Sequence, residues 1–205
     1  MIGVITGDII ESRKSKTPKI WLTNLTESLS RVSTNDKNWE LYRGDSFQIE
    51  FENPQDAFLN AVYIKSCIKT IKNMDVRLAI GIGHKTYHGS NVSESNGEVF
   101  QFSGETLEAL KKEKLSLKIK TPNTVLDTEL NLYFKLALIS MDHWTANSAE
   151  VVKVSIENPE LQQKELGNLI GINQNAVSYR LKRANFNEIM ELDRMFRNKI
   201  ETLIA

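Results

Sequence analysis

Residues 163–182 constrain the fold more than any other stretch, because they place small, apolar and capping residues in the order that two helices joined by a tight turn require. Gly167 is small enough for two helices to cross closely at that point. Gly171 can adopt the left-handed backbone conformation that ends a helix. Ile172 is expected to plug the turn, and Asn173 to cap the second helix. The stretch therefore predicts two helices that meet at a short, sharp corner.

The two predicted helices have distinct inner and outer faces, and the Asn-Pro-Glu sequence at 158–160 favours the start of the first. The apolar residues expected to face inward are Leu161, Leu166, Leu169, Ile170, Ala176, Val177 and Leu181. The outer faces of the second helix are expected to carry Gln174, Asn175, Ser178, Tyr179, Arg180, Lys182 and Arg183. Such side chains suit base edges and phosphates, and the arrangement resembles the helix-turn-helix of many bacterial transcription regulators. We expect these seven residues to bind DNA; a helix corner that only packs is the alternative.

The net charge of the C-terminal module bears on how strongly it is expected to bind DNA. The whole chain has a formal net charge of zero, and residues 145–205 contain eight Lys or Arg and eight Asp or Glu. Most non-specific DNA affinity comes from neutralising phosphates, so a neutral module predicts weak non-specific binding. Its basic residues nevertheless gather on the second helix. We therefore expect a homodimer, in which a second half-site supplies further binding energy.

Before Pro122, strand-like and helix-like patterns alternate. The expected strands are 1–6, 39–42, 47–51, 76–82 and 115–121, and the expected helices are 19–32, 53–72 and 104–114. The order βαββαβαβ predicts an α+β, ferredoxin-like sandwich with one helical layer on a mainly antiparallel sheet.

After Pro122 the strand pattern stops, and the chain is expected to be helical. We expect an α+β domain at 1–124, a linker helix at 125–144 and an all-α helix-turn-helix domain at 145–205. The linker is rich in Leu, Phe and Ile between 130 and 139. This run predicts an inter-domain or dimer seam, or simply a buried linker helix.

Two aspartates fall at expected strand ends. Asp8 follows the first strand, and Asp45 lies in the turn of the hairpin after it. Two carboxylates together with phosphate oxygens and water would suit Mg²⁺ or Mn²⁺. Ser12, Arg13 and Arg43 are the nearest candidates to bind a phosphate. The alternative is turn chemistry for the aspartates and a solvated surface for their neighbours.

The sequences at 7–10, 44–47 and 76–83 are similar to the class III nucleotidyl cyclase domain, a resemblance that covers roughly residues 1–121. It implies that Asp8 and Asp45 bind the metal ions that activate a nucleoside triphosphate.

Other positions depart from the cyclase pattern. Leu41 stands where the family has its adenine-reading lysine, and Glu108 and Lys112 stand where it has its transition-state Asn and Arg. An acid near a triphosphate would repel it, and Lys lacks the bidentate fork of Arg. These departures argue against turnover and leave metal or nucleotide binding open.

The chain as a whole looks like the SatD family, with Gly-Asp-Ile-Ile-Glu-Ser-Arg at 7–13, Arg-Gly-Asp-Ser-Phe-Gln at 43–48 and a C-terminal helix-turn-helix. That family is associated with bacterial stress and acid-tolerance loci, and its biochemical role is poorly defined.

The remaining sequence features concern location and function class. A single cysteine, Cys67, fits a reducing cytoplasm, and neither a signal peptide nor a membrane-spanning apolar run is evident. The leading expectation is a cytoplasmic DNA-binding transcriptional regulator with a degenerate cyclase-like sensing or dimerisation domain. One alternative is a metal-dependent enzyme acting on a nucleotide phosphate through Asp8 and Asp45. Another is a scaffold whose helix-turn-helix binds protein.

Overall fold

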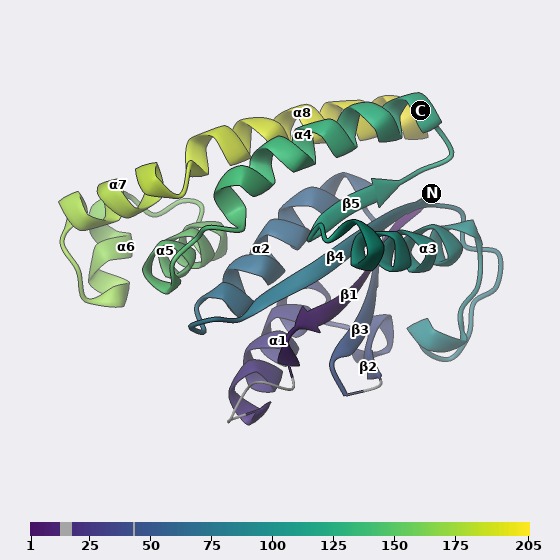
Figure 1. The fold of residues 1–205 in the computed structure, drawn as a ribbon, viewed down its shortest axis with the longest axis horizontal. Coiled ribbons are helices and arrows are strands. Elements are labelled where there is room, and N and C mark those ends of the chain that lie inside the picture. Colours follow the sequence, from purple (N-terminus) through teal and green to yellow (C-terminus); the bar gives the residue numbers. More distant parts are fainter. Residues whose placement is uncertain (13–17, 43) are drawn as a thin grey trace.

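A computed structural model of the chain describes residues 1–12, 18–42 and 44–205 (Figure 1). The strands are β1 (Ile2–Ile10), β2 (Trp39–Tyr42), β3 (Ser46–Phe51), β4 (Asp75–Gly83) and β5 (Leu117–Lys120). The helices are α1 (Pro18–Val32), α2 (Ala57–Lys69), α3 (Glu98–Glu113), α4 (Thr124–Met141), α5 (Ala146–Glu157), α6 (Gln163–Ile170), α7 (Gln174–Arg183) and α8 (Phe186–Ile204). Short 3-10 turns are η2 (Asp36–Asn38), η3 (Pro54–Asp56) and η4 (Val92–Glu94).

The strands form one five-stranded sheet in the order β2-β3-β1-β4-β5. β1 is antiparallel to both β3 and β4, β2 is antiparallel to β3, and β5 runs parallel to β4. The predicted α+β class, the βαββαβαβ order of the first half and the mainly antiparallel sheet are therefore confirmed.

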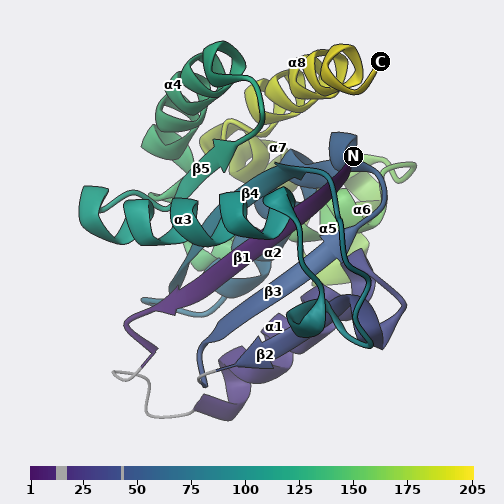
Figure 2. The same cartoon turned by 90° about the vertical axis from the view of Figure 1, so that its right-hand side faces the viewer.

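The prediction of a single helical layer is wrong, because helices cover both faces of the sheet (Figure 2). Alternate side chains of a strand point to opposite faces. Ile5 faces the core beneath α1 and α2, whereas Thr6 faces α3 and donates from Oγ1 to Ser103 Oγ at 2.8 Å. An amphipathic pattern says which side of a helix is buried but not which face of a sheet buries it. α3 also begins at Glu98, well before the predicted residue 104.

One continuous hydrophobic core joins the sheet to the C-terminal helices. From α4, Leu130, Phe134 and Leu138 point into it at intervals of four residues. Phe134 stacks on Phe58 of α2 with ring centroids 5.0 Å apart, and Phe196 of α8 lies 6.1 Å from Phe134. α4 and α8 thus lie side by side over the same core as α2, with α5, α6 and α7 gathered at one end of the pair (Figure 1).

A polar cluster around the buried Lys65 ties α2 to α4. The Lys65 side chain is fully buried, and its Nζ lies 2.7 Å from Asp75 Oδ1 and 2.8 Å from Asp142 Oδ1. Ser116 Oγ donates to the same Asp142 oxygen at 2.6 Å. Lys69 Nζ donates to Asp75 Oδ2 at 3.1 Å and to the Asp142 carbonyl at 2.7 Å. We call these five residues the lysine clamp; they fix the end of α4 to the first half of the chain.

Candidate nucleic-acid interface

The corner between α6 and α7 has the geometry that its glycines and asparagine predict. Gly171 ends α6 with φ 70° and ψ 31°, in the left-handed region. A Cβ at Gly167 would lie 2.5 Å from the carbonyl oxygen of Ile172, so only glycine fits there without movement. Asn173 Oδ1 accepts a hydrogen bond from the Ala176 amide at 2.9 Å and caps α7. The predicted roles of these residues are confirmed.

The start of α6 differs from the prediction. Asn158 ends the preceding helix instead: its amide and its side-chain Nδ2 both donate to the Val154 carbonyl, at 3.1 and 2.9 Å. α6 begins at Gln163, behind a capping box in which the Gln162 amide donates to Glu165 Oε2 at 2.8 Å. The Asn-Pro-Glu sequence was misread because an asparagine can close one helix as well as open another.

α5, α6 and α7 enclose a small core of their own, centred on the buried side chains of Val151, Leu166 and Val177. The partly buried residues around it are Val154, Leu161, Ile170, Ile172 and Leu181. We call this three-helix unit the lobe. Leu169, predicted to face inward, is 59% exposed. The face of α6 that meets the rest of the lobe is set by Leu166 and Gly167, and Leu169 falls on its outer flank.

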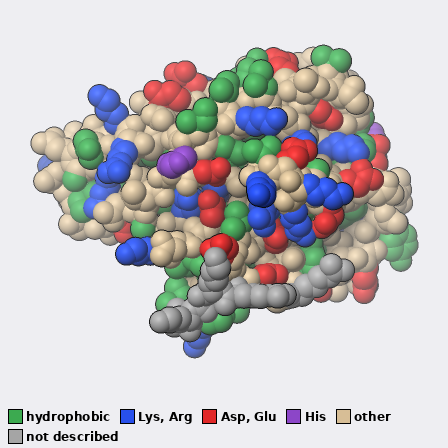
Figure 3. Space-filling model, in the orientation of Figure 1, with side chains coloured by type: hydrophobic (Ala, Val, Ile, Leu, Met, Phe, Trp, Pro, Cys, Tyr) green, Lys and Arg blue, Asp and Glu red, His purple; other side chains and the backbone are tan. Residues whose placement is uncertain are grey.

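α7 presents a polar and basic face to solvent. Six of its seven predicted DNA-binding residues are exposed: Gln174, Asn175, Ser178, Tyr179, Lys182 and Arg183. In the space-filling view, Lys and Arg side chains lie over this end of the molecule (Figure 3). The seventh residue, Arg180, lies on the flank of the helix, and its Nη1 donates to Glu150 Oε2 of α5 at 2.9 Å. Arg180 therefore holds α7 against α5.

The C-terminal end of α7 is anchored to α4. The carbonyl oxygen of Ala184 accepts hydrogen bonds from Trp144 Nε1 and from Ser140 Oγ, each at 3.0 Å. Asn185 then adopts a left-handed conformation, with φ 51°, and the chain turns into α8. With Arg180 bonded to α5 on its flank, α7 has a fixed orientation relative to α4. Nothing in the sequence pattern of Trp144 or Ser140 indicated this anchor.

The two aspartates lie at the same end of the sheet. Asp8 pairs in register with Ser46 of β3, and the Ile9 amide donates to the carbonyl oxygen of Asp45 at 3.0 Å. Ser12 Oγ donates to Asp45 Oδ2 at 2.5 Å, so Ser12 is held beside this carboxylate. The other two predicted phosphate-binding residues, Arg13 and Arg43, lie outside the described residues.

Two cations, Arg77 of β4 and Lys111 of α3, act on the Asp8 carboxyl at this end of the sheet. Arg77, opposite Asp8 in β4, has its Nη1 3.4 Å from Asp8 Oδ2. Burial raises the pKa of Asp8; Arg77 and then Lys111 act to lower it, and Asp45 adds a smaller upward effect. The register of β1 against β4 gives the position of Arg77, so this partner could be found from the sequence only once the strand pairing is known.

The fit of this end to Mg²⁺ or Mn²⁺ is partial. Asp8 Oδ1 is buried and has no hydrogen-bond partner among the described residues, so it is a candidate ligand atom. Within the described residues, however, no three His, Cys, Asp or Glu side chains come together as a metal site requires. A cation here would need further oxygens, from phosphate or water, beside Asp8 and Asp45.

In comparisons with known proteins, no protein-family model and no curated protein matches the chain. The SatD and cyclase resemblances therefore stay predictions. Across the described residues, no helix is long and apolar enough to cross a bilayer.

Proposed function

We propose that the chain is a DNA-binding transcriptional regulator in which the lobe acts as the helix-turn-helix module and α7 enters the major groove. The observation that carries this proposal is the solvent-exposed polar face of α7, presented by a helix whose orientation is fixed through Arg180 and Ala184. The six exposed side chains of this face are of the kinds that bond bases and phosphates.

The residues divide by position along α7. Recognition helices read bases mainly with their N-terminal residues, which assigns base-edge contacts to Gln174, Asn175 and Ser178. An amide side chain can bond adenine in a bidentate manner. Lys182 and Arg183, in the last turn, are placed for phosphates. Arg180 is left out of the contact set, because its guanidinium bonds Glu150.

The α+β half is assigned a sensing or dimerising role in this proposal. The strand order β2-β3-β1-β4, all antiparallel, with the element order βαββαβ, supports a relation to ferredoxin-like and cyclase-type domains. The lysine clamp and the bonds to the Ala184 carbonyl give that half a continuous connection to α7. SatD membership, and a cytoplasmic location, belong to the same proposal.

The test is selection of the purified full-length protein against randomised DNA duplexes, followed by anisotropy titration of the enriched duplex. We expect the double variant Lys182→Ala/Arg183→Ala to weaken binding about tenfold or more, since each charged contact is worth about 1 kcal/mol or above. The matched control is Lys37→Ala/Lys112→Ala, which removes two exposed charges far from α7. Failure to enrich any duplex would overturn the proposal.

A second candidate function is a metal-dependent enzyme acting on a nucleotide phosphate, favoured by the unpartnered Asp8 Oδ1. When bound, Mg²⁺ or Mn²⁺ would neutralise phosphate charge, while Asp8 and Asp45 would hold it and Ser12 would orient Asp45. The test incubates wild type and Asp45→Ala with ATP or GTP and Mn²⁺, and records both product formation and thermal stability. Wild type with neither Asp45-dependent product nor Asp45-dependent stabilisation by Mn²⁺ would remove this candidate.

A further inference from the structure

α4 is apolar on two opposite sides, although only one side faces the core. Opposite the buried residues, Leu132, Leu136 and Ile139 recur at i, i+4 and i+7 and are 55, 58 and 70% exposed. Val125, in the first turn of α4, lies on the same side two turns before Leu132 and is 77% exposed. Contiguous apolar surface of this kind on a folded chain marks an interaction site. The predicted seam thus divides into an inner row and an outer row.

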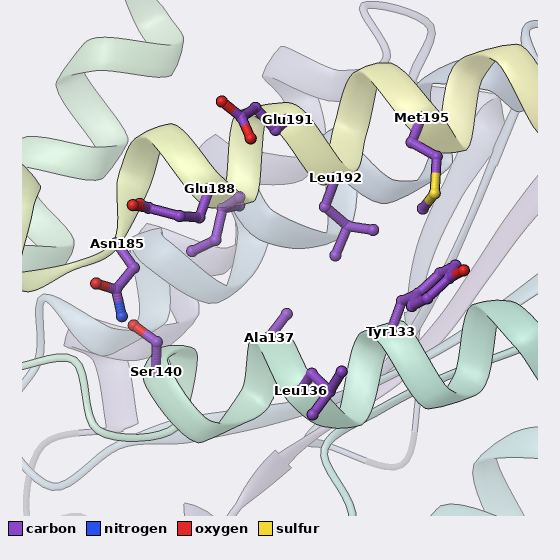
Figure 4. Close-up of a pocket in the computed structure, with 10 residues that line it drawn as sticks. Tyr133, Leu136, Ala137, Ser140, Asn185, Glu188, Glu191, Leu192 and Met195 are labelled. Atoms are coloured by element: carbon purple, nitrogen blue, oxygen red, sulfur yellow. The ribbon is translucent and has the colours of Figure 1, made fainter.

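A groove of about 440 Å³ runs beside the outer row, between α4 and α8 (Figure 4). Tyr133 and Ala137 of α4 and Leu192 and Met195 of α8 point into it. Its polar rim on α8 includes the exposed carboxylates of Glu188 and Glu191.

The outer row and the groove lie on different flanks of α4. Successive residues of a helix are about 100° apart, so Tyr133 and Ala137 face α8 while Leu132 and Ile139 lie on the flank away from it. Leu136 lies between the two flanks. Consider a second copy related to the first by a two-fold axis parallel to α4. Each copy would then place its Leu132 and Ile139 over the groove of the other copy. A perpendicular axis would instead oppose row to row and groove to groove.

Charge favours the same arrangement. Lys135 is exposed on the flank that carries Leu132, and no ion pair joins it to any described residue. Lys199 Nζ lies 2.9 Å from a carboxylate oxygen of Glu129, so these two residues lie at the same height along the antiparallel helices α8 and α4. Counting eight residues along each helix from this pair places Glu191 beside position 137, two residues from Lys135. With the axis parallel to α4, Lys135 therefore meets the acidic rim of the other copy. The interface is self-complementary in both shape and charge.

We propose that a second copy of this chain occupies the groove, with the two α4 helices packed in parallel. Parallel packing brings both lobes to the same end of the dimer, because the lobe follows the C-terminal end of α4. Two α7 helices would then face one duplex, a use of the dimer that rests on the proposed DNA binding. The dimer itself rests only on the surfaces of α4 and α8.

Cysteine cross-linking of the full-length protein tests the orientation. In a Cys67→Ala background, Val125→Cys and Leu136→Cys are each oxidised and analysed for covalent dimer. These positions are about 17 Å apart along α4, at 1.5 Å per residue. In parallel packing both sit near the two-fold axis, and both should form dimer. Antiparallel packing can bring at most one of them to its own copy, and that result would overturn the proposal. Ile20→Cys, exposed on α1, is the control that should not cross-link.

Sedimentation measures the association itself. We expect wild type to be dimeric, and Leu136→Glu/Ile139→Glu to be monomeric with unchanged circular dichroism, because both side chains are exposed. Leu169→Glu, an equally exposed change on α6, should leave the dimer intact. A monomeric wild type at about 0.1 mM, where any micromolar dimer forms, would overturn the proposal. A dimer that binds no DNA would sustain this inference while the DNA-binding function fails, so the two are separable.

Discussion

The main core and the core of the lobe differ in size and in how each is held. The main core runs unbroken from β1 and α2 to Phe134 of α4 and Phe196 of α8. The lobe has just three buried hydrophobic residues at its centre, Val151, Leu166 and Val177. So small a core supplies limited stability by itself. The lobe is stable because the sheet half holds it, which is how a short helix such as α7 keeps a fixed orientation.

The polar interactions follow the same division. The main half buries the Lys65 cation against two carboxylates in the lysine clamp, and these carboxylates compensate the cost of taking the cation out of water. The lobe relies on bonds at its borders, among them the hydrogen bonds of Trp144 and Ser140 to the Ala184 carbonyl and the hydrogen bond of Tyr63 Oη to Glu157 at 2.7 Å. Damage to the main half should therefore unfold the whole chain, whereas damage to the lobe should stay local.

Lys65→Met should have the largest effect. It removes the fully buried cation that faces Asp75 and Asp142, whose side chains are 21% and 37% exposed. We therefore expect a loss of about 3 kcal/mol of unfolding free energy, the lower end of the range for a buried ion pair. Urea denaturation should show a single, lower transition that includes the lobe. Lys118→Met, which breaks a partly exposed pair with Glu113, should cost at most about 1 kcal/mol. Equal losses for the two variants would show that the clamp is not structural.

The clamp also predicts a dependence on pH. Burial raises the pKa of Asp142, whereas the charge and the hydrogen bond of Lys65 lower it. The lowering effects are the larger in total, so the pKa lies below its ordinary value of 3.8. A carboxyl with a lowered pKa contributes stability above its unfolded value and loses it as the pH falls through the folded value. Wild type should therefore lose more unfolding free energy than Lys65→Met below about pH 4. Parallel pH profiles would contradict this coupling.

Gly167→Ala should have an intermediate, local effect. The new Cβ would meet the Ile172 carbonyl oxygen at 2.5 Å, and relieving such an overlap costs about 1–3 kcal/mol. Hydrogen exchange should rise in α6 and α7 and stay unchanged in β1 and β4. The matched control is Gly104→Ala in α3, where nothing lies within 4 Å and the gain in helix propensity should stabilise by about 0.5–1 kcal/mol. Faster exchange throughout the chain would show that the lobe is not a separate unit of stability.

Asp8→Asn should have the smallest effect and the opposite sign. Burial raises the pKa of Asp8, and Arg77 opposes this effect. The protein therefore loses stability as the pH rises from the pKa of Asp8 in the unfolded chain through its pKa in the folded chain, because the carboxyl becomes ionised while buried. At pH 7 the neutral amide removes that cost, and the melting temperature should rise by a few degrees at most. A clear fall in melting temperature would mean that the pairing with Arg77 outweighs burial.

Local chemistry was readable from the sequence, and contacts between distant segments were not. The conformation of Gly171 and the cap at Asn173 depend on neighbours a few residues away, and both were predicted. Asn158 was misassigned because two helices compete for it within the same few residues. Lys65 gave no signal, since its partner Asp142 comes from a segment 77 positions later and a lysine in an amphipathic helix ordinarily faces water.

The candidate site divides in the same way. The exposed residues of α7 follow from helical periodicity once the corner at Gly171 is known. The ion pair that holds Arg180 against α5, away from the exposed face of α7, depends on how α5 crosses α7, which periodicity does not specify. The carboxylate end of the sheet was expected from turn positions, whereas Arg77 enters through the register of β4 against β1.

The salt dependence of DNA binding tests the central claim most directly. For the selected duplex, the logarithm of the association constant is measured against the logarithm of salt concentration for wild type and for Lys182→Ala/Arg183→Ala. Each lost phosphate contact should make the slope shallower by about 0.9, so the double variant should lose about 1.8 per bound chain. A slope unchanged from wild type would contradict the assignment of α7 as the DNA-binding helix.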